Sequence, residues 1–206
     1  MSLVEYRKKR NFAVTPEPQP GPVHPRSSHP RSKGEPPQFV VQKHQASHLH
    51  YDLRLEIDGV LKSWAVPKGP SLDPEIKRLA VQTEDHPLEY ATFEGKIPQG
   101  EYGAGEMIVW DRGQWRPKQD AGKSLTQGRI EFTLEGEKLS GRFILIRTRP
   151  SSSGKFQWLL KKLDDESARP ESSGIVTEEH MDSVLSGNSL KTRQTKPVKK
   201  TKTKIS

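Results

Sequence analysis

The sequence predicts a mainly β fold, a β-barrel with a few short peripheral helices. From Phe39 to about Leu163 nearly every local pattern is that of a short strand, and turn-forming residues separate these patterns. We find no internal repeat and no regular alternation of strands with helices, which a parallel sheet would require. Many short strands joined by turns are typical of a closed or nearly closed barrel, or of a sandwich.

The clearest strand signal is the run HYDLRLEIDG at residues 50–59, in which polar and apolar side chains alternate. It ends in Asp58-Gly59, a pair typical of a two-residue hairpin turn. The cross-strand pairs that this turn predicts are Ile57 with Val60, Leu53 with Trp64, and Arg54 with Ser63. Further strands are predicted at Arg78–Thr83, Glu106–Asp111, Arg129–Leu134, Arg142–Arg147 and Phe156–Lys162.

Changes in composition divide the chain into five parts. These are a basic arm (1–17), a Pro/Ser-rich linker (18–37), the barrel (38–165), a C-terminal extension (166–187) and a basic tail (188–206). Short helices are predicted at Leu3–Arg10 and Glu178–Leu185. The tail contains many lysines and no acidic residue, so we expect it to be disordered and to attract nucleic acid without regard to sequence.

Composition also excludes several classes of protein. Because the chain has no cysteine, it has no disulfides and no thiolate metal site, and a metal would need histidine, carboxylate or water as ligands. No stretch approaches the roughly 20 apolar residues of a membrane span, and the N-terminus lacks the apolar part of a signal peptide. We therefore expect a cytoplasmic protein with no membrane partner. The net charge of +8 points to a polyanionic partner, and nucleic acid is the leading candidate.

The polar face of the predicted hairpin carries the groups of a metal site. His50, Asp52, Arg54 and Glu56 share one side of an extended chain. If the preceding strand lies beside them, His44 joins His50 and Asp52. Two imidazoles and one carboxylate leave open coordination positions on Mn²⁺, Fe²⁺, Co²⁺ or Zn²⁺. A His-x-Asp pair alone is more often a structural hydrogen bond, so the third ligand and the neighbouring arginine are what favour a site.

Two kinds of metal chemistry fit this pattern. Non-haem iron oxygenases also use two histidines and a carboxylate, but they typically bind their organic-acid cosubstrate with one basic group. This chain offers several basic groups near the pattern, namely Arg54, Lys68, Arg78 and Arg10. That many cations are better matched to a phosphate, whose oxygens gather negative charge in the transition state.

His86 is a second candidate catalytic residue. Pro87 restricts the backbone directly after it and favours a loop. With Tyr90 nearby, His86 is suited to donate a proton or a hydrogen bond to a phosphoryl group. A loop histidine that caps local backbone is an equal alternative. His48 is expected at the rim of the site and His180 on the surface.

Two other features have simpler structural interpretations. The segment GKIPQGEYGAGE (95–106) resembles a phosphate-binding glycine loop, but strand residues follow it, which favours turns between barrel strands. The four tryptophans lie mostly at strand positions that favour the core. Trp115, in a polar stretch, is the one that we retain as a candidate contact to DNA bases.

Several long segments closely resemble the 3′-phosphoesterase domain of bacterial DNA ligase D. They are RKKRNF, TPEP, FVVQKH, LHYDLRLEIDGVLKSWAVPKGPS, KRLAVQTEDHPLEYATFEGKIPQGEYGAGEMIVWDRG and FQWLLKK, in this order from about Tyr6 to Lys162. No ligase or polymerase segment is attached, so the chain resembles a stand-alone form of this repair module.

The resemblance implies both an activity and a fold. The family trims damaged or ribonucleotide-ended DNA 3′ termini with manganese and leaves a 3′-OH. A phosphodiesterase step removes a terminal ribonucleoside, and a phosphomonoesterase step removes the remaining 3′-phosphate. The expected cofactor is Mn²⁺, with Co²⁺ or Zn²⁺ as alternatives at the same site, and the family fold is a β-barrel with peripheral helices.

The resemblance also assigns roles to individual residues. The metal ligands fall on His44, His50 and Asp52. The catalytic and phosphate-contacting positions fall on Arg54, His86, Tyr90, Lys68 and Arg78, with Gln42 and Ser63 as supporting residues. Arg10 and Glu17 match family residues needed for activity, so the arm of residues 1–17 is expected to contribute to the active site. Asn11 stands where the family commonly has Asp, which makes the diesterase step less secure than the monoesterase step.

The expected partners follow from this activity. They are the 3′ ends of DNA primer–templates, including ribonucleotide-terminated ends, with a separate DNA ligase, a polymerase or Ku as further candidates. We expect a monomer associated with the nucleoid. The rival hypothesis is a non-catalytic DNA-end-binding adaptor for a separate ligase.

Overall fold

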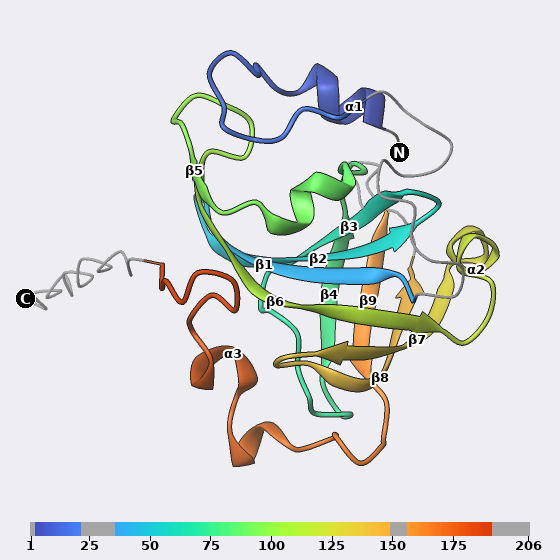
Figure 1. Cartoon of the computed structure of the whole chain (residues 1–206). Helices are drawn as coiled ribbons and strands as arrows, with labels where there is room; N and C mark the ends of the chain where they lie inside the picture. The colour runs from blue at the N-terminus through green and yellow to red at the C-terminus, as the bar shows by residue number, and fades with distance from the viewer. Residues whose placement is uncertain (1–2, 22–35, 149–155, 191–206) are drawn as a thin grey trace, which may run out of the picture.

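The computed structural model describes residues 3–21, 36–148 and 156–190, and β-strands dominate these ranges (Figure 1). The strands are β1 (Gln38–Gln45), β2 (Leu49–Ile57), β3 (Val60–Val66), β4 (Lys77–Gln82), β5 (Gly95–Ile97), β6 (Gly105–Pro117), β7 (Arg129–Gly136), β8 (Ser140–Arg147) and β9 (Gln157–Lys162). The helices are α1 (Leu3–Lys8), α2 (Ala121–Gln127) and α3 (Val176–Glu179), with 3₁₀ turns η1 (Leu88–Thr92) and η2 (Glu171–Ser173).

All the neighbouring strands in the sheet pair antiparallel, in the order β1-β2-β3-β4-β9-β8-β7-β6-β5. An additional pairing of β1 with β6 closes the sheet on itself, and β5 extends β6 at one end. Closure removes the exposed edges that an open sheet would present. The predicted β-barrel with a few short helices is therefore confirmed.

The hairpin of β2 and β3 has the predicted register. Ile57 pairs with Val60, Leu53 with Trp64, and Arg54 with Ser63. The turn is made by Asp58 at φ 52° and Gly59 at φ 76°. Positive φ at both central turn residues matches the twist of the flanking strands and explains why this pair closes the hairpin.

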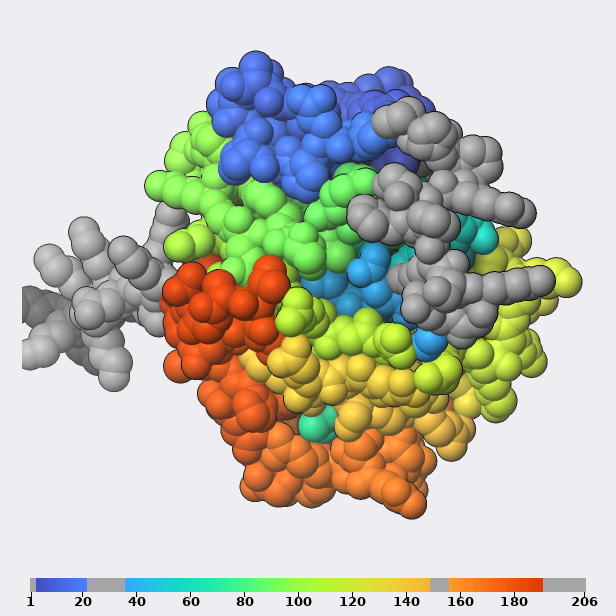
Figure 2. All heavy atoms as spheres, viewed as in Figure 1, coloured from blue at the N-terminus to red at the C-terminus, as the bar shows by residue number. Residues whose placement is uncertain are grey.

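The two faces of β1 and β2 contribute to different cores. One face fills the barrel with apolar side chains such as Phe39, Leu53 and Leu55. The opposite face belongs to a second cluster, which includes Val40 and residues of α1, η1, β3, β5 and β6. In Figures 1 and 2 the N-terminal arm lies over the segment that contains η1, on this outer side of the barrel. The outer face of β1 and β2 is thus covered as well.

The prediction of a helix at Glu178–Leu185 is wrong. The helix α3 ends at Glu179, and the chain then runs beside β6, where Val184 N donates to Val109 O over 2.9 Å. The Ser183 hydroxyl accepts hydrogen bonds from the backbone of the next residues and stabilises a turn instead of a helix. At the other end, α1 is slightly shorter than the predicted Leu3–Arg10.

Trp115 is not a surface contact, which corrects the prediction for this residue. The strand β6 continues past the predicted end at Asp111, and Trp115 points into the barrel, fully buried, with its ring edge-on to Phe132. Strand alternation, rather than the polarity of its neighbours, decides its position. The helix α2 was not predicted, although Asp120 caps its start with a 2.7 Å bond from Lys123 N.

The glycine-containing segment 95–106 joins β5 to β6 by turns, as predicted, with a strand directly after it. Among the described residues, none of the helices is both long enough and apolar enough to cross a membrane. Most of the predicted linker and of the basic tail lies outside the described residues.

Candidate active site on the outer face of the barrel

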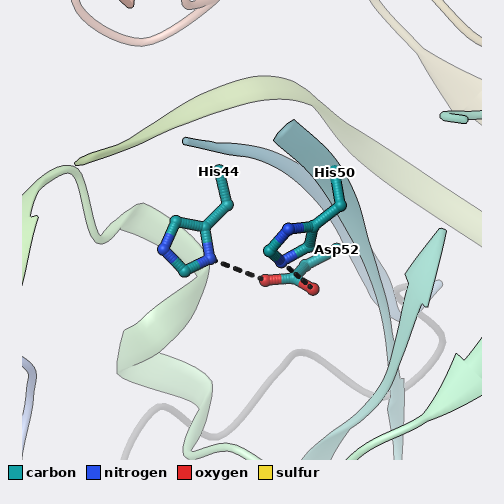
Figure 3. Close-up of side chains that lie close together, drawn as sticks. All are labelled: His44, His50 and Asp52. Carbon is teal, nitrogen blue, oxygen red and sulfur yellow. Dashed lines mark ion pairs between the residues drawn. The ribbon is translucent and has the colours of Figure 1, made fainter. Parts of the chain in front are cut away.

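The structure brings His44, His50 and Asp52 together on the outer face of β1 and β2 (Figure 3). In the register of the two strands, His44 lies opposite His50, and Gln42 lies opposite Asp52. One ligand atom from each of the three residues lies within 4.8 Å of the other two. Asp52 lies between the rings, 3.9 Å from His44 Nδ1 and 3.6 Å from His50 Nε2. The three donors therefore converge on one point.

The donor set fits a divalent metal. Burial lowers the pKa of His44 to about 4, so its imidazole is neutral at pH 7 and keeps a free lone pair. His50 Nδ1 lies 3.0 Å from the carbonyl oxygen of His48 and can donate to it, which directs the Nε2 lone pair toward Asp52. Nitrogen and oxygen ligands of this kind suit Mn²⁺, Fe²⁺, Co²⁺ or Zn²⁺.

Arg54 links the metal donors to the rest of the site. Its guanidinium is buried and donates to Asp52 Oδ2 over 3.0 Å and to Gln42 Oε1 over 2.6 Å. It also lies 3.0 Å from Ser63 Oγ and 2.9 Å from His86 Nδ1. A guanidinium held by this many fixed partners is preorganised to meet a second anion beside the metal.

Gln42 and Ser63 have supporting positions. The Gln42 side-chain amide donates to the backbone carbonyls of Tyr90 and Phe93, over 3.0 and 2.9 Å, so it connects β1 to η1. Ser63 Oγ donates to the carbonyl of Leu61 over 3.0 Å. Both side chains hold Arg54 in place from the two strands, β1 and β3, that flank β2.

His86 lies next to Arg54, and its backbone pairs with a strand. Two hydrogen bonds join it to Leu61, of 2.8 and 3.0 Å, so it extends the sheet beside β3. Its ring is buried, with Nε2 3.3 Å from an Arg10 nitrogen. Burial, followed by the charges of Arg54 and Arg10, holds the pKa of His86 well below its usual range. His86 is therefore neutral at pH 7, which favours a hydrogen-bonding role.

The N-terminal arm completes this side of the site. Arg10 donates to Glu17 Oε1 over 2.7 Å and to Glu84 Oε1 over 3.0 Å, and all three side chains are buried. The Tyr90 hydroxyl donates to the same Glu17 oxygen over 2.8 Å. Burial, the largest cause, raises the pKa of Tyr90 well above its usual value, so the hydroxyl keeps its proton. The arm is thus connected to the barrel by buried charges.

Glu84 is a residue of the site that was not predicted from the sequence. Its carboxylate binds both Lys9, over 3.0 Å, and Arg10, and its backbone carbonyl lies 2.9 Å from His86 Nδ1. It therefore positions the arm and the histidine at once. An acidic residue two positions from the candidate histidine was the available signal, but its partners are more than 70 residues away in the chain and only the fold reveals them.

Lys68 and Arg78 are not brought together with this cluster. They line a groove of about 510 Å³ with Lys43 and Tyr51, whose side chains leave β1 and β2 on the face opposite to the metal donors. Arg78 forms an ion pair with Glu171. No contact that the structure gives for the described residues joins either cation to the cluster, so their predicted role stays a prediction.

Three other predicted residues lie at the periphery. His48 and His180 are exposed, as expected of rim and surface residues. Asn11 is exposed too, and its side-chain oxygen accepts from Ala13 N over 3.2 Å within the turn that follows α1. Its contacts are local to the arm.

Comparison with known proteins agrees with the geometry. The family model described as "DNA Ligase D 3'-phosphoesterase domain" matches residues 42–147. The protein named "Multifunctional non-homologous end joining protein LigD" from Pseudomonas aeruginosa is 55% identical over 188 residues, which cover 91% of this chain and 22% of that protein. The protein of the same name from Mycolicibacterium smegmatis is 46% identical over 176 residues, covering 82% of this chain and 22% of its own length.

A third relative, from Mycobacterium tuberculosis, is named "Multifunctional non-homologous end joining DNA repair protein LigD". It is 44% identical over 164 residues, which cover 80% of this chain and 20% of that protein. This chain therefore spans about a fifth of the length of these curated relatives. The range matched by the family model includes the candidate metal donors, Arg54 and His86. The chain belongs to the family of DNA ligase D 3′-phosphoesterase domains.

Proposed function

We propose that this protein is a manganese-dependent phosphoesterase that processes DNA 3′ ends. It removes 3′-terminal ribonucleosides as a phosphodiesterase and 3′-phosphates as a phosphomonoesterase, and it leaves a 3′-OH for repair and ligation. The single observation that carries the proposal is the bond of 3.0 Å between Arg54 and Asp52. It supports the proposal because a guanidinium beside the three candidate metal donors is suited to bind a phosphate, as an anion clamp. The family match supports the same assignment.

A metal at His44, His50 and Asp52 would supply Lewis-acid polarisation of a phosphate oxygen. Mn²⁺ is the cofactor that we propose, and Co²⁺ and Zn²⁺ suit the same donors. Arg54 binds a non-bridging oxygen of the phosphate and offsets the charge that develops there. Removal of one such contact costs on the order of 10²–10³ in rate.

His86 acts on the other side of the phosphate. Because it is neutral, it donates a hydrogen bond without adding repulsion to Arg54. Arg10 and Tyr90, both held by Glu17, keep the arm closed over this histidine and exclude water from it. Arg10 and Glu17 are accordingly proposed as contributors to the diesterase step.

The biological setting that we propose follows from the names of the relatives, which refer to non-homologous end joining. The substrates are primer–template 3′ ends, and a separate ligase, a polymerase or Ku are the candidate partners. The protein acts as a cytoplasmic, nucleoid-associated monomer in this proposal. The net charge of +8 favours binding to DNA.

The deciding experiment is a time course on two primer–templates, one ending in a single ribonucleotide and one ending in a 3′-phosphate. With Mn²⁺ present, the first should lose the ribonucleoside and then the phosphate, and the second should lose phosphate directly. A chelator should stop both reactions. His48→Ala changes an exposed side chain in the turn between β1 and β2 and keeps the backbone carbonyl that His50 contacts, so it is the matched control and should behave as wild type.

Other outcomes favour other functions. Retention of DNA with no product on either primer would favour the adaptor hypothesis. Consumption of oxygen and 2-oxoglutarate would favour an iron oxygenase. Loss of phosphate without loss of the ribonucleoside would implicate Asn11, and Asn11→Asp should then restore the diesterase step.

A further inference from the structure

Tyr102 differs from the other aromatic residues of the molecule in its exposure. Of the tyrosine, tryptophan and phenylalanine side chains in the described ranges, only Tyr102 and Phe156 are classed as exposed, and Tyr102 has 44% of its surface accessible. Phe156 lies beside the Arg147 guanidinium, next to β8 and β9. Tyr102 lies in the loop between β5 and β6, which leads directly into the candidate active site.

The loop is fixed at both of its ends. Glu101 N donates to Pro98 O over 3.3 Å and Ala104 N donates to Glu101 O over 3.1 Å, so one tight turn precedes Tyr102 and a second contains it. At its far end, Gly105 packs so closely on the metal donor His44 that an added Cβ would lie 2.8 Å from the ring nitrogen Nε2. Tyr102 is therefore carried on backbone that contacts a metal donor.

The other side of Tyr102 faces the arm. Its hydroxyl lies 3.4 Å from Lys9 Nζ and 3.5 Å from Glu84 Oε2. Lys9 Nζ is 4.6 Å from the centre of the ring, and the Arg10 guanidinium is 5.6 Å from it. Since Arg10 itself reaches His86, the ring is separated from the candidate phosphate site by one side chain.

An exposed ring beside cations has a defined use in nucleic-acid binding. Single-stranded ends are bound by aromatic rings on which bases stack and by cations that follow the phosphates. Tyr102 and Lys9, whose side chain is 35% exposed, offer this pair at the rim of a site that takes a terminal phosphate. When the terminal phosphate is bound in the site, the base of the same nucleotide must lie close to the rim.

We propose that Tyr102 stacks on the base of the nucleotide that carries the 3′-phosphate. This inference rests on the proposed function and adds a substrate-positioning residue to it. Lys9 orients the ring through the cation–π contact and also contacts the DNA strand beside the ring. Tyr102 thus places the terminal phosphate by holding the base to which it is joined.

The test compares two 3′-phosphate primers, one with a normal terminal base and one whose terminal nucleotide is abasic. On the normal primer, Tyr102→Ala should lower kcat/KM roughly tenfold to a hundredfold, the range of one base–aromatic stack. On the abasic primer, wild type and Tyr102→Ala should react equally. Tyr102→Phe should keep the wild-type rate on both primers, and Tyr102→Leu should resemble Tyr102→Ala.

Each alternative gives a different pattern. An equal loss on both primers would overturn the proposal, because Tyr102 would then only support the arm. A loss in Tyr102→Phe as large as in Tyr102→Ala would assign the effect to the hydroxyl and would also overturn it. Phe156→Ala is the matched control and should leave both rates unchanged. If wild type itself released no phosphate from the normal primer, the proposed function would fail. If wild type were active and Tyr102→Ala had the same kcat/KM on that primer, only the stacking proposal would be overturned.

Discussion

The two faces of strands β1 and β2 are both buried, yet they are built from opposite kinds of residue. Toward the barrel interior, Leu53 and Leu55 pack among apolar side chains. Toward the arm, Asp52 and Arg54 from the same strand are almost as buried, at 7% and 2% exposure. A strand that alternates apolar and charged residues would ordinarily leave the charged face in water. Here the arm and η1 cover it.

The apolar inner face and the charged outer face of β1 and β2 contribute differently to stability and to function. Burial of apolar surface stabilises the barrel by about 25 cal/mol per Å². A buried ion pair contributes little net stability, because the loss of hydration offsets the attraction between the charges. The network of Arg10, Glu17, Glu84, Asp52 and Arg54 is therefore poorly explained as a device for folding. Its placement around the candidate metal donors and a neutral histidine is what the proposed binding of a phosphate would require.

The largest effect on stability is expected from the inner face. Trp64 is fully buried and lies edge-on to Trp158, with 5.7 Å between ring centres. Trp64→Ala should lower the free energy of unfolding by about 3–5 kcal/mol, since the cavity cannot collapse fully. Urea denaturation measures this change. Leu79→Ala, at an exposed barrel position, should change it by no more than about 0.5 kcal/mol; similar losses in both variants would contradict the assignment of the core.

The outer face should respond in activity. His50→Ala, Asp52→Ala and His86→Ala should each reduce the release of 3′-phosphate by at least about 10²–10³, because each removes one contact to the reacting phosphate or its metal. Single-turnover assays with Mn²⁺ measure the rates, and His48→Ala serves as control. Near-normal turnover by His86→Ala would show that its assigned role is wrong.

Changes in the N-terminal arm should affect both stability and activity, each to a smaller extent. Glu17→Ala leaves Arg10 and the Tyr90 hydroxyl without their shared acceptor, which should cost about 1–3 kcal/mol in stability. Phosphate release should fall in parallel, and limited proteolysis should cut the arm sooner. Glu89→Gln, an exposed residue next to Tyr90, should change neither property. An arm that remains protected in Glu17→Ala would contradict this connection.

At neutral pH the smallest expected effect comes from His44, because it changes stability only as the pH falls. Burial lowers the pKa of His44 to about 4 in the folded protein, from 6.5 when unfolded. Between these values the unfolded chain binds a proton that the folded chain does not, so stability falls as the pH is lowered from about 6.5 toward 4. In metal-free protein, His44→Gln should remove about 1–3 kcal/mol of this dependence, measured by urea denaturation at several pH values. His48→Gln should retain it, and a wild-type profile in His44→Gln would contradict the assignment.

Sequence patterns predicted those parts of the fold that depend on neighbouring residues. The alternation at residues 50–57 and the pair Asp58-Gly59 determine the hairpin and its register. The alternation by itself places His50, Asp52 and Arg54 on one face of β2. Joining His44 to them required the correct assumption that its strand lies beside β2. These are short-range consequences of strand geometry.

Long-range packing was not predictable in the same way. Glu84 acquires its role only because the fold brings the arm to it, and Trp115 is buried because β6 continues beyond the last apolar run. The segment after α3 has helix-forming residues, but pairing with β6 and the Ser183 turn override that preference. In each case a contact with a distant residue outweighs the local signal.

The outer face of β1 and β2 is proposed to bind a catalytic metal beside an anion clamp. A titration with Mn²⁺ followed by electron paramagnetic resonance tests it most directly, because free and bound Mn²⁺ give different signals. Wild type should bind one Mn²⁺ per chain, His48→Ala should bind it as tightly, and Asp52→Asn should lose it. Equal binding by wild type and Asp52→Asn, or no binding by wild type, would contradict the account.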